Sequence, residues 1–158
     1  MPDAPLRLSR DAVDWALALG LVALWLMLTV LLVMRRARTA APAAQAIVVY
    51  ASQTGHAGDL AQQAQLRIAA SGADCALVEA DSLTPEHLAT AKLLVFVAST
   101  TGEGEAPDNA RRFARDVLGA AVDLSGKQVA VLALGDRRYR QFCGFGRRIA
   151  DWARRGGA

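Results

Sequence analysis

The chain has 158 residues, of which 53% are apolar and 21% charged, so it has room for one domain and is not a disordered chain. From residue 39 onward it carries 13 Lys and Arg against 12 Asp and Glu, and this near neutrality argues against nucleic acid as the main partner. The two cysteines, Cys75 and Cys143, form neither a metal-binding spacing nor a disulfide framework, and both fit a reducing cytoplasm.

The first predicted element is a transmembrane helix over residues 13–34. It contains an apolar run of twenty residues, Trp15 to Met34, with only two interruptions. At about 1.5 Å per residue such a helix spans about 30 Å, the thickness of the hydrocarbon core of a bilayer. A cleaved signal peptide is the main alternative, but its apolar stretch would be only about 7–15 residues long. Because three arginines follow the run, the positive-inside rule predicts a single-pass anchor in the cell (inner) membrane with the C-terminal domain in the cytoplasm.

Residues 1–12 are assigned to an N-terminal segment and residues 35–45 to a basic flank and linker. Strand and helix patterns then alternate over residues 46–158. The predicted strands are Ala46–Ala51, Cys75–Ala80, Lys92–Ala98 and Gln128–Leu134, the last two apolar enough to be buried. The predicted helices are Ala57–Ala70, one that begins at Thr84-Pro85, Pro107–Leu118 and Tyr139–Arg155. This alternation predicts an α/β fold, a doubly wound parallel sheet with helices on both faces.

Ligands of such sheets bind outside the carboxyl ends of the strands, so the loops after the first, third and fourth strands are the candidate site. The first loop offers hydroxyls, an amide and a glycine at a helix N-terminus, where unpaired N–H groups favour a phosphate. It lacks the lysine of a nucleotide-triphosphate loop. A plain capped strand–helix turn is the alternative. The first loop consists of Ser52, Gln53, Thr54, Gly55, His56 and Ala57.

The second loop, Ser99 to Pro107, has two glycines separated by one residue, which allow close approach to a ligand; a solvated acidic connector is the alternative. The third loop, Leu134 to Cys143, carries Tyr139, whose ring can stack on a flat heterocycle or serve ordinary packing.

Taken together, the motifs Y-A-S-Q-T-G, S-T-T-G-E-G-E-A-P-D-N-A and L-G-D-x-x-Y-x-x-F-C resemble the flavin mononucleotide (FMN) domain of diflavin reductases. The likeness is closest to the flavoprotein subunit of NADPH–sulfite reductase, and it covers about residues 47–152. It implies a flavodoxin-like sheet, FMN as cofactor and an electron-transfer function. It also implies that the first loop holds the phosphate.

The same resemblance implies that two further loops enclose the flavin ring. On one side lie Ser99, Thr100, Thr101 and Gly102, where Thr101 replaces the aromatic residue of many relatives and Gly102 can turn its carbonyl toward the flavin. On the other side Tyr139 is the stacking residue of a loop that comprises Leu134, Gly135, Asp136, Arg137, Arg138, Tyr139, Arg140, Gln141, Phe142 and Cys143.

Two charged regions accompany these loops. The first is formed by Glu103, Glu105 and Asp108, acids that either help to dock an electron-transfer partner, as in the family, or are simply a solvated helix start. The second is a set of seven arginines between residues 137 and 155. They are interpreted as a solvated helix face, with a basic docking surface or a contact with anionic lipid as the alternative.

The chain departs from the family because it supplies four of the five strands of a flavodoxin-like sheet, and the fifth strand and last helix are missing. A module for FAD and NADPH is missing as well, so the simplest interpretation is a fragment of a longer reductase. We expect the domain to relay electrons from an NADPH/FAD reductase module to a metal- or haem-containing acceptor. No catalytic acid, base or metal ligand is assigned, and whether the chain by itself is an enzyme stays open. The alternatives are a truncated remnant without competent flavin binding, or a non-enzymatic signalling module, which would need acids where Ser52 and Ser99 stand.

Overall fold

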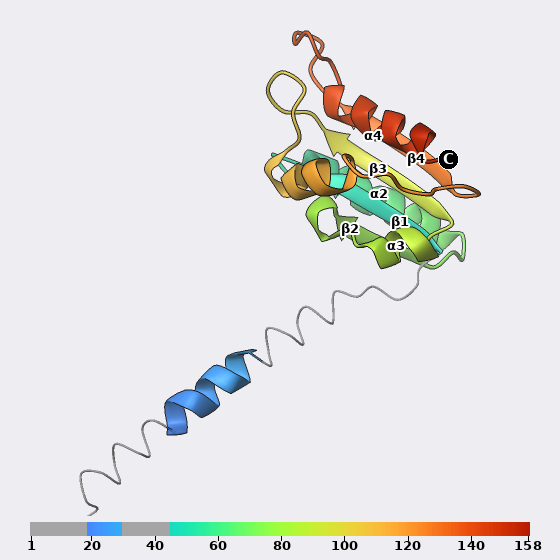
Figure 1. The fold of residues 1–158 in the computed structure, drawn as a ribbon. Coiled ribbons are helices and arrows are strands. Elements are labelled where there is room, and N and C mark those ends of the chain that lie inside the picture. The colour runs from blue at the N-terminus through green and yellow to red at the C-terminus, as the bar shows by residue number, and fades with distance from the viewer. Residues whose placement is uncertain (1–18, 30–44) are drawn as a thin grey trace, which may run out of the picture. The chain divides into compact units, whose positions relative to one another are not determined.

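The computed structural model describes residues 19–29 and 45–158, and the chain divides into two units, Met1–Ala40 and Ala41–Ala158. In the first unit, residues 19–29 form a helix (Figure 1). At about 1.5 Å per residue these eleven described residues extend about 17 Å, against about 30 Å of bilayer core.

Across the two described ranges, no helix is both long enough and apolar enough to cross a membrane. This finding overturns the predicted transmembrane helix over residues 13–34, of which residues 13–18 and 30–34 lie outside the described residues. The predicted membrane contact and single-pass inner-membrane location rested on that helix, and they are corrected with it.

The second unit is built on a parallel sheet of four strands in the order β2-β1-β3-β4. The strands are β1 (Ala46–Ala51), β2 (Cys75–Glu79), β3 (Leu93–Ser99) and β4 (Gln128–Leu134). In the register of the sheet, Ala51 lies level with Ala98, and Ser99 lies level with Leu134, so the carboxyl ends of β1, β3 and β4 share one edge. The predicted flavodoxin-like α/β sheet is confirmed, and each strand begins and ends within one residue of its predicted bounds.

Helices cover the two faces of the sheet, with α2 (His56–Ala70) on one face and α4 (Gly144–Arg155) on the other (Figure 1). The face under α2 buries alternate residues of β1 and β3, among them Val48 and Val97. The opposite face holds the larger core, in which the rings of Phe96, Phe113 and Trp152 pack with centroids 5.8–6.0 Å apart. Short helices on this side are η1 (Ala80–Ser82) and α3 (Pro85–Thr90), the latter with the predicted Thr84 cap and Pro85 at its first turn.

The predicted helix Pro107–Leu118 is helical but irregular. A 3₁₀ turn, η2 (Asp108–Ala110), is followed by a π-helical stretch, η3 (Phe113–Val117). At the start of the second stretch, the carboxylate of Asp81 accepts the Phe113 N–H at 2.8 Å. Downstream, the Leu118 N–H bonds the carbonyl of Phe113, five residues back, at 3.1 Å. The side chain of Phe113 faces the core and is fully buried.

The last helix begins at Gly144 rather than at the predicted Tyr139, because Cys143 adopts a left-handed conformation (φ 55°) that α-helical backbone does not continue through. Its inner face is formed by Phe145, Ile149 and Trp152, all buried. Gly146 permits close packing on the sheet, since a Cβ at this position would lie 3.0 Å from the Cα of Ala133.

Strand β4 is the edge of the sheet, as expected for a chain that lacks a fifth strand, and it is buried on one face only. Val129 and Val131 pack toward the core beneath α4, whereas the alternate residues face outward. Leu132 is the clearest case, with 47% of its surface exposed. In the described part of the chain, the outer backbone groups of β4 pair with no other strand.

Candidate functional site

The candidate site lies at the carboxyl ends of β1, β3 and β4, where three loops follow the strands. The chain leaves β1 for α2 on one face of the sheet, whereas it leaves β3 for η2 and η3 on the other. Because β1 and β3 are neighbours, the chain diverges to opposite faces after these two strands, and ligands of sheets with this topology generally bind at such a point.

The first loop ends in a helix N-terminus without a side-chain cap. Gly55, in a left-handed conformation (φ 92°), precedes α2, and no side chain accepts a hydrogen bond from the first turn. Ala57 is fully buried, and its N–H has no recorded acceptor in the described part of the chain. Ser52 Oγ accepts the Gly55 N–H at 3.0 Å, which leaves its own O–H available to donate. This loop can therefore offer several donors to one anion.

Residues of the next segment hold the first loop in place. Asn109 Oδ1 accepts the Ser52 N–H at 2.9 Å, while Asn109 Nδ2 donates to Glu79 Oε1 at 2.9 Å. Gln53 makes two hydrogen bonds with Asp108, each of 3.2 Å. The sequence interpretation missed Asn109 and Glu79 as positioning residues, although the D-N pair of the second motif was the available signal.

The second loop is a tight turn closed on itself. Thr101 and Glu105 form an antiparallel bridge with hydrogen bonds of 3.0 and 2.8 Å, and the turn between them needs positive φ at Gly102 and Gly104. The Thr101 hydroxyl donates to the carbonyl of Ala106 at 3.2 Å, so it bonds its own loop.

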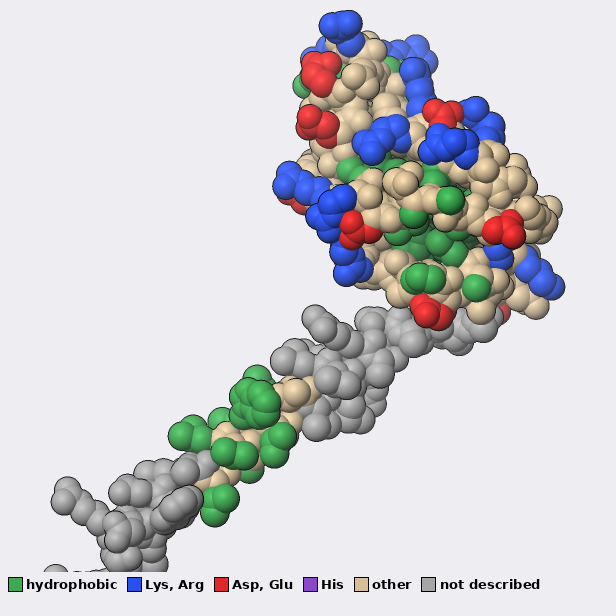
Figure 2. All heavy atoms as spheres, in the orientation of Figure 1, with side chains coloured by type: hydrophobic (Ala, Val, Ile, Leu, Met, Phe, Trp, Pro, Cys, Tyr) green, Lys and Arg blue, Asp and Glu red, His purple; other side chains and the backbone are tan. Residues whose placement is uncertain are grey.

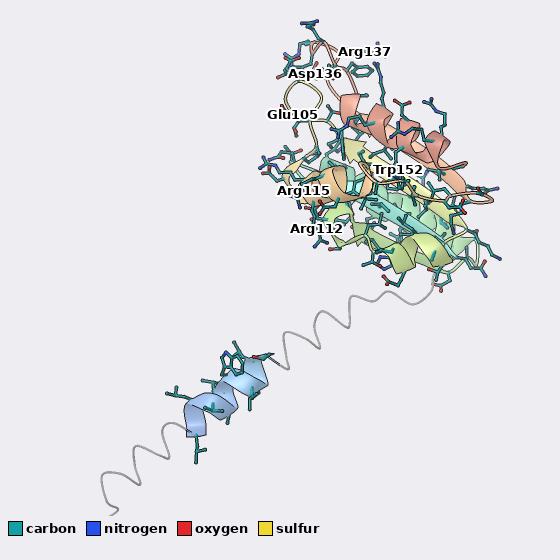
Figure 3. The ribbon with its side chains drawn as sticks, viewed as in Figure 1. Glu105, Arg112, Arg115, Asp136, Arg137 and Trp152 are labelled. Carbon is teal, nitrogen blue, oxygen red and sulfur yellow. The ribbon has the colours of Figure 1, made fainter. Side chains whose placement is uncertain are left out.

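The third loop packs against the second. A Cβ on Gly144 would lie 2.9 Å from the Cα of Gly104, and a Cβ on Gly135 would lie 2.8 Å from the Cys143 nitrogen, so both glycines are required for this fit. The buried Cys143 thiol donates to the carbonyl of Ala133 at 3.4 Å. The third loop is thus fixed at its base, while its tip projects from the sheet, as the labelled Asp136 and Arg137 indicate (Figure 3).

A small cavity of ≈130 Å³ lies between the second and third loops. Thr100 contributes to its wall, and its hydroxyl is buried without a hydrogen-bond partner, which is uncommon for a buried polar group. Tyr139 also lines the cavity, with 50% of its surface exposed. The other lining residues are Gly102, Gly135, Asp136, Gln141, Phe142 and Cys143.

The charges at the tip of the third loop are fixed by local contacts. Asp136 accepts hydrogen bonds from the side chain of Arg138 at 2.9 Å and from its backbone N–H at 2.9 Å, and these lower the pKa of the Asp136 carboxyl to about 2. The Arg137 guanidinium lies 5.8 Å from the centre of the Phe142 ring, a cation–π contact. With its pKa lowered, the Asp136 carboxylate stays ionised throughout the physiological pH range.

These features fit FMN, the cofactor implied by the sequence. The uncapped start of α2 suits a terminal phosphate, and the unpartnered Thr100 hydroxyl and half-exposed Tyr139 ring suit a flat, polar-edged heterocycle. A cavity of ≈130 Å³ is smaller than the roughly 300–1,000 Å³ typical of ligand pockets, so the loops as they stand enclose only part of a flavin ring.

The structure brings most of the predicted site residues to one edge of the sheet, but not all in equivalent roles. The side chain of His56 is exposed, and Arg140 lies at the exposed tip of its loop. Asp108, predicted as part of an acidic patch, is engaged by Gln53 and by Arg111, the latter at 2.6 Å. Glu103 and Glu105 remain exposed on the second loop.

Comparisons with known proteins agree with this geometry. The family model described as flavodoxin matches residues 48–158. The flavoprotein alpha-component of sulfite reductase [NADPH] from Vibrio parahaemolyticus is 38% identical over 110 residues, which are 69% of this chain and 18% of the relative. The corresponding protein of Bacillus subtilis is 40% identical over 101 residues, 63% of this chain and 17% of the relative.

Among solved structures, oxidised flavodoxin 2 from Bacillus cereus aligns with a TM-score of 0.64 and 30% identity, covering 72% of this chain and 77% of the flavodoxin. The chain therefore spans about three quarters of a flavodoxin but less than a fifth of the length of the curated relatives it matches.

Proposed function

The chain belongs to the flavodoxin family, and from that premise we propose that its three loops hold FMN for electron transfer between an NADPH/FAD reductase module and a metal- or haem-containing acceptor. The domain is a flavodoxin-like FMN electron-transfer domain similar to that of the sulfite reductase flavoprotein subunit. The reductase module, the acceptor and the role of each loop residue are the parts that we propose.

The observation that carries the proposal is that an uncapped helix N-terminus after β1 and a half-exposed tyrosine after β4 lie at the same edge of the sheet, where the strand order reverses between β1 and β3. The first loop offers N–H groups and the hydroxyls of Ser52 and Thr54 to a phosphate. Asn109 and Asp108 keep this loop in register with the second loop.

When bound, FMN supplies the electron-transfer chemistry, and the protein supplies binding and orientation. In this proposal Tyr139 stacks on the ring, and Thr100 donates or accepts a hydrogen bond at the ring's polar edge. Gly102 presents its carbonyl without the strain that a side chain would add at φ 48°. No side chain of the three loops is assigned to acid–base catalysis.

The names of the relatives support the choice of partners. They describe a flavoprotein component of an NADPH-dependent sulfite reductase, and a further relative, 35% identical over 92 residues, is the sulfite reductase [NADPH] subunit beta of Schizosaccharomyces pombe. We therefore propose a haem- or metal-containing protein of sulfite reduction as the acceptor class, with NADPH as the ultimate electron source.

The test is a comparison of three flavins that differ in the phosphate region. Titration of the flavin-free chain should give tight binding of FMN, weak binding of riboflavin, which lacks the phosphate, and weak binding of FAD, whose phosphate is extended by a nucleotide. Thr54→Ala should weaken FMN and leave riboflavin unchanged, with Thr90→Ala, at the far end of α3, as the matched control. Equal affinity for FMN and riboflavin would contradict the phosphate role of the first loop, and a chain that binds no flavin would refute the proposed function.

A further inference from the structure

The charge of the second unit is distributed unevenly. Residues 136–158 hold seven arginines and two aspartates, a formal charge of +5, whereas residues 45–135 hold six basic and ten acidic side chains, a formal charge of −4. The positive charge is therefore concentrated in the third loop and in α4, although the unit as a whole is nearly neutral.

The packing of α4 directs its arginines outward. Because Phe145, Ile149 and Trp152 are buried against the sheet, Arg147 projects on the opposite side of α4, and Arg148 lies on the flank of the helix; both arginines are exposed. The tip of the third loop adds further exposed arginines, and Figure 2 shows basic side chains over this loop and along α4. We call this region the basic surface; it consists of Arg137, Arg138, Arg140, Arg147 and Arg148.

Most of this charge is not neutralised within the described part of the chain. Arg138 pairs with Asp136 at 2.5 Å, but no ion pair joins the other four arginines to an acid among the described residues. Arg148 also lines a groove of ≈410 Å³ together with Thr101 and Glu105 of the second loop. The basic surface therefore borders the candidate flavin site at the third loop and, through Arg148, at the second loop.

We propose that the basic surface docks an acidic protein that exchanges electrons with this domain, an inference that rests on the proposed function. Tyr139 lies within the same loop as three of the arginines, so a partner held by them is brought beside the proposed flavin. Opposite charges on two proteins raise the rate of encounter and fix their orientation. Arginine and tyrosine side chains side by side are also typical of the centre of a protein interface.

Two small haem proteins serve as probes, the acidic soluble domain of cytochrome b5 and the basic cytochrome c. The FMN-loaded full chain is reduced and mixed with each probe in a stopped-flow instrument at ionic strengths between about 10 and 300 mM. Over this range the Debye length falls from about 30 Å to less than about 8 Å. Reduction of the acidic probe should be fast at low salt and slow by about tenfold or more as salt rises. Reduction of the basic probe should not slow as salt rises.

Charge reversal locates the docking surface. The double variant R147E/R148E, which lies outside the cofactor loops, should slow reduction of the acidic probe about tenfold at low salt. Arg67→Glu, which reverses the charge of an exposed arginine in the last turn of α2 on the other face of the sheet, should leave this rate unchanged, whereas Arg147→Glu, which makes a charge change of equal size, should slow it. Equal effects of the two variants, or a rate that does not depend on salt, would overturn the proposal.

Measurements of flavin content and of direct binding distinguish a failure of the proposed FMN function from a failure of the basic surface as a docking site. Flavin content is measured first by absorption, so that a chain without FMN refutes the proposed function alone. The acidic probe is then titrated into the flavin-free chain by calorimetry, where binding that weakens in R147E/R148E supports the basic surface. If a single-stranded RNA oligonucleotide binds this surface and the acidic haem protein does not, the surface is a nucleic-acid contact and the inference is wrong.

Discussion

Replacement of Tyr139 by alanine separates the binding role of this ring from a packing role. The ring is half exposed, so its removal should change the free energy of unfolding by no more than about 0.5 kcal/mol, as for most surface substitutions. If the ring stacks on the flavin, the variant loses about 0.5–1.5 kcal/mol of binding free energy beyond area burial. At about 1.4 kcal/mol per factor of ten, that is roughly a two- to twelvefold weaker affinity for FMN.

The assay is a titration of flavin-free protein with FMN, followed by the fluorescence of the flavin. Tyr139→Phe is the matched control, because it keeps the ring and removes only the hydroxyl. It should bind FMN nearly as well as the unmodified chain, while a denaturant titration reports the stability of both variants. An alanine variant with unchanged affinity and unchanged flavin fluorescence would refute the stacking role. A loss of stability in the flavin-free state would instead show that the ring serves packing.

Three further predictions concern the third loop and the region that supports it. Gly146→Ala should lower the free energy of unfolding by about 1–3 kcal/mol, because the new Cβ would overlap the side chain of Ala133; a denaturant midpoint that does not fall would contradict this packing. Leu132→Lys should reduce self-association through the open edge of β4, measured by sedimentation velocity, and an equal effect from the exposed Leu66→Lys would show that the edge is not responsible. Arg138→Gln should raise the pKa of the Asp136 carboxyl from about 2 toward 3.8, observed by NMR titration. Because folding lowers the pKa of the Asp136 carboxyl, the contribution of this carboxylate to the free energy of unfolding is fully present above about pH 4 and is lost as the pH falls toward 2. If the free energy of unfolding depends on pH in the same way in Arg138→Gln, the assignment is contradicted.

The strands could be predicted from the sequence because parallel strands buried on both faces are continuous apolar runs. The predicted bounds of Ala46–Ala51 and Gln128–Leu134 match those of β1 and β4, and the order of the four strands follows from the flavodoxin-like resemblance. The environment of β4 follows from the absence of a fifth strand among the predicted elements. Its apolar run is typical of an interior strand, but Leu132 is exposed in the described chain because no further strand or helix covers that side.

The errors elsewhere have two causes. Hydropathy reports how favourably a segment leaves water, but it does not fix which residues are helical, and no helix among residues 19–29 and 45–158 is long and apolar enough to cross a membrane. At the irregular stretch of the predicted helix Pro107–Leu118, the Phe113 N–H is bonded by Asp81, which lies about thirty residues earlier in the chain. A periodic pattern reports only local residues, so it cannot include a carboxylate that arrives through tertiary folding.

For the candidate site, the sequence motifs predict where the loops lie but not which conformation they adopt. Each loop could be located from its residues and its strand, but its conformation depends on partners from another loop. Gly104 and Gly144 must both lack a side chain for the second and third loops to touch, and Asn109 must reach from the second segment to the first for Ser52 to be fixed. The three loops therefore act as one unit, and a substitution at Gly144 should disturb Tyr139 even though it removes no contact with the flavin. Affinity for FMN is accordingly a property of the packing between loops, and not only of the side chains that the motifs contain.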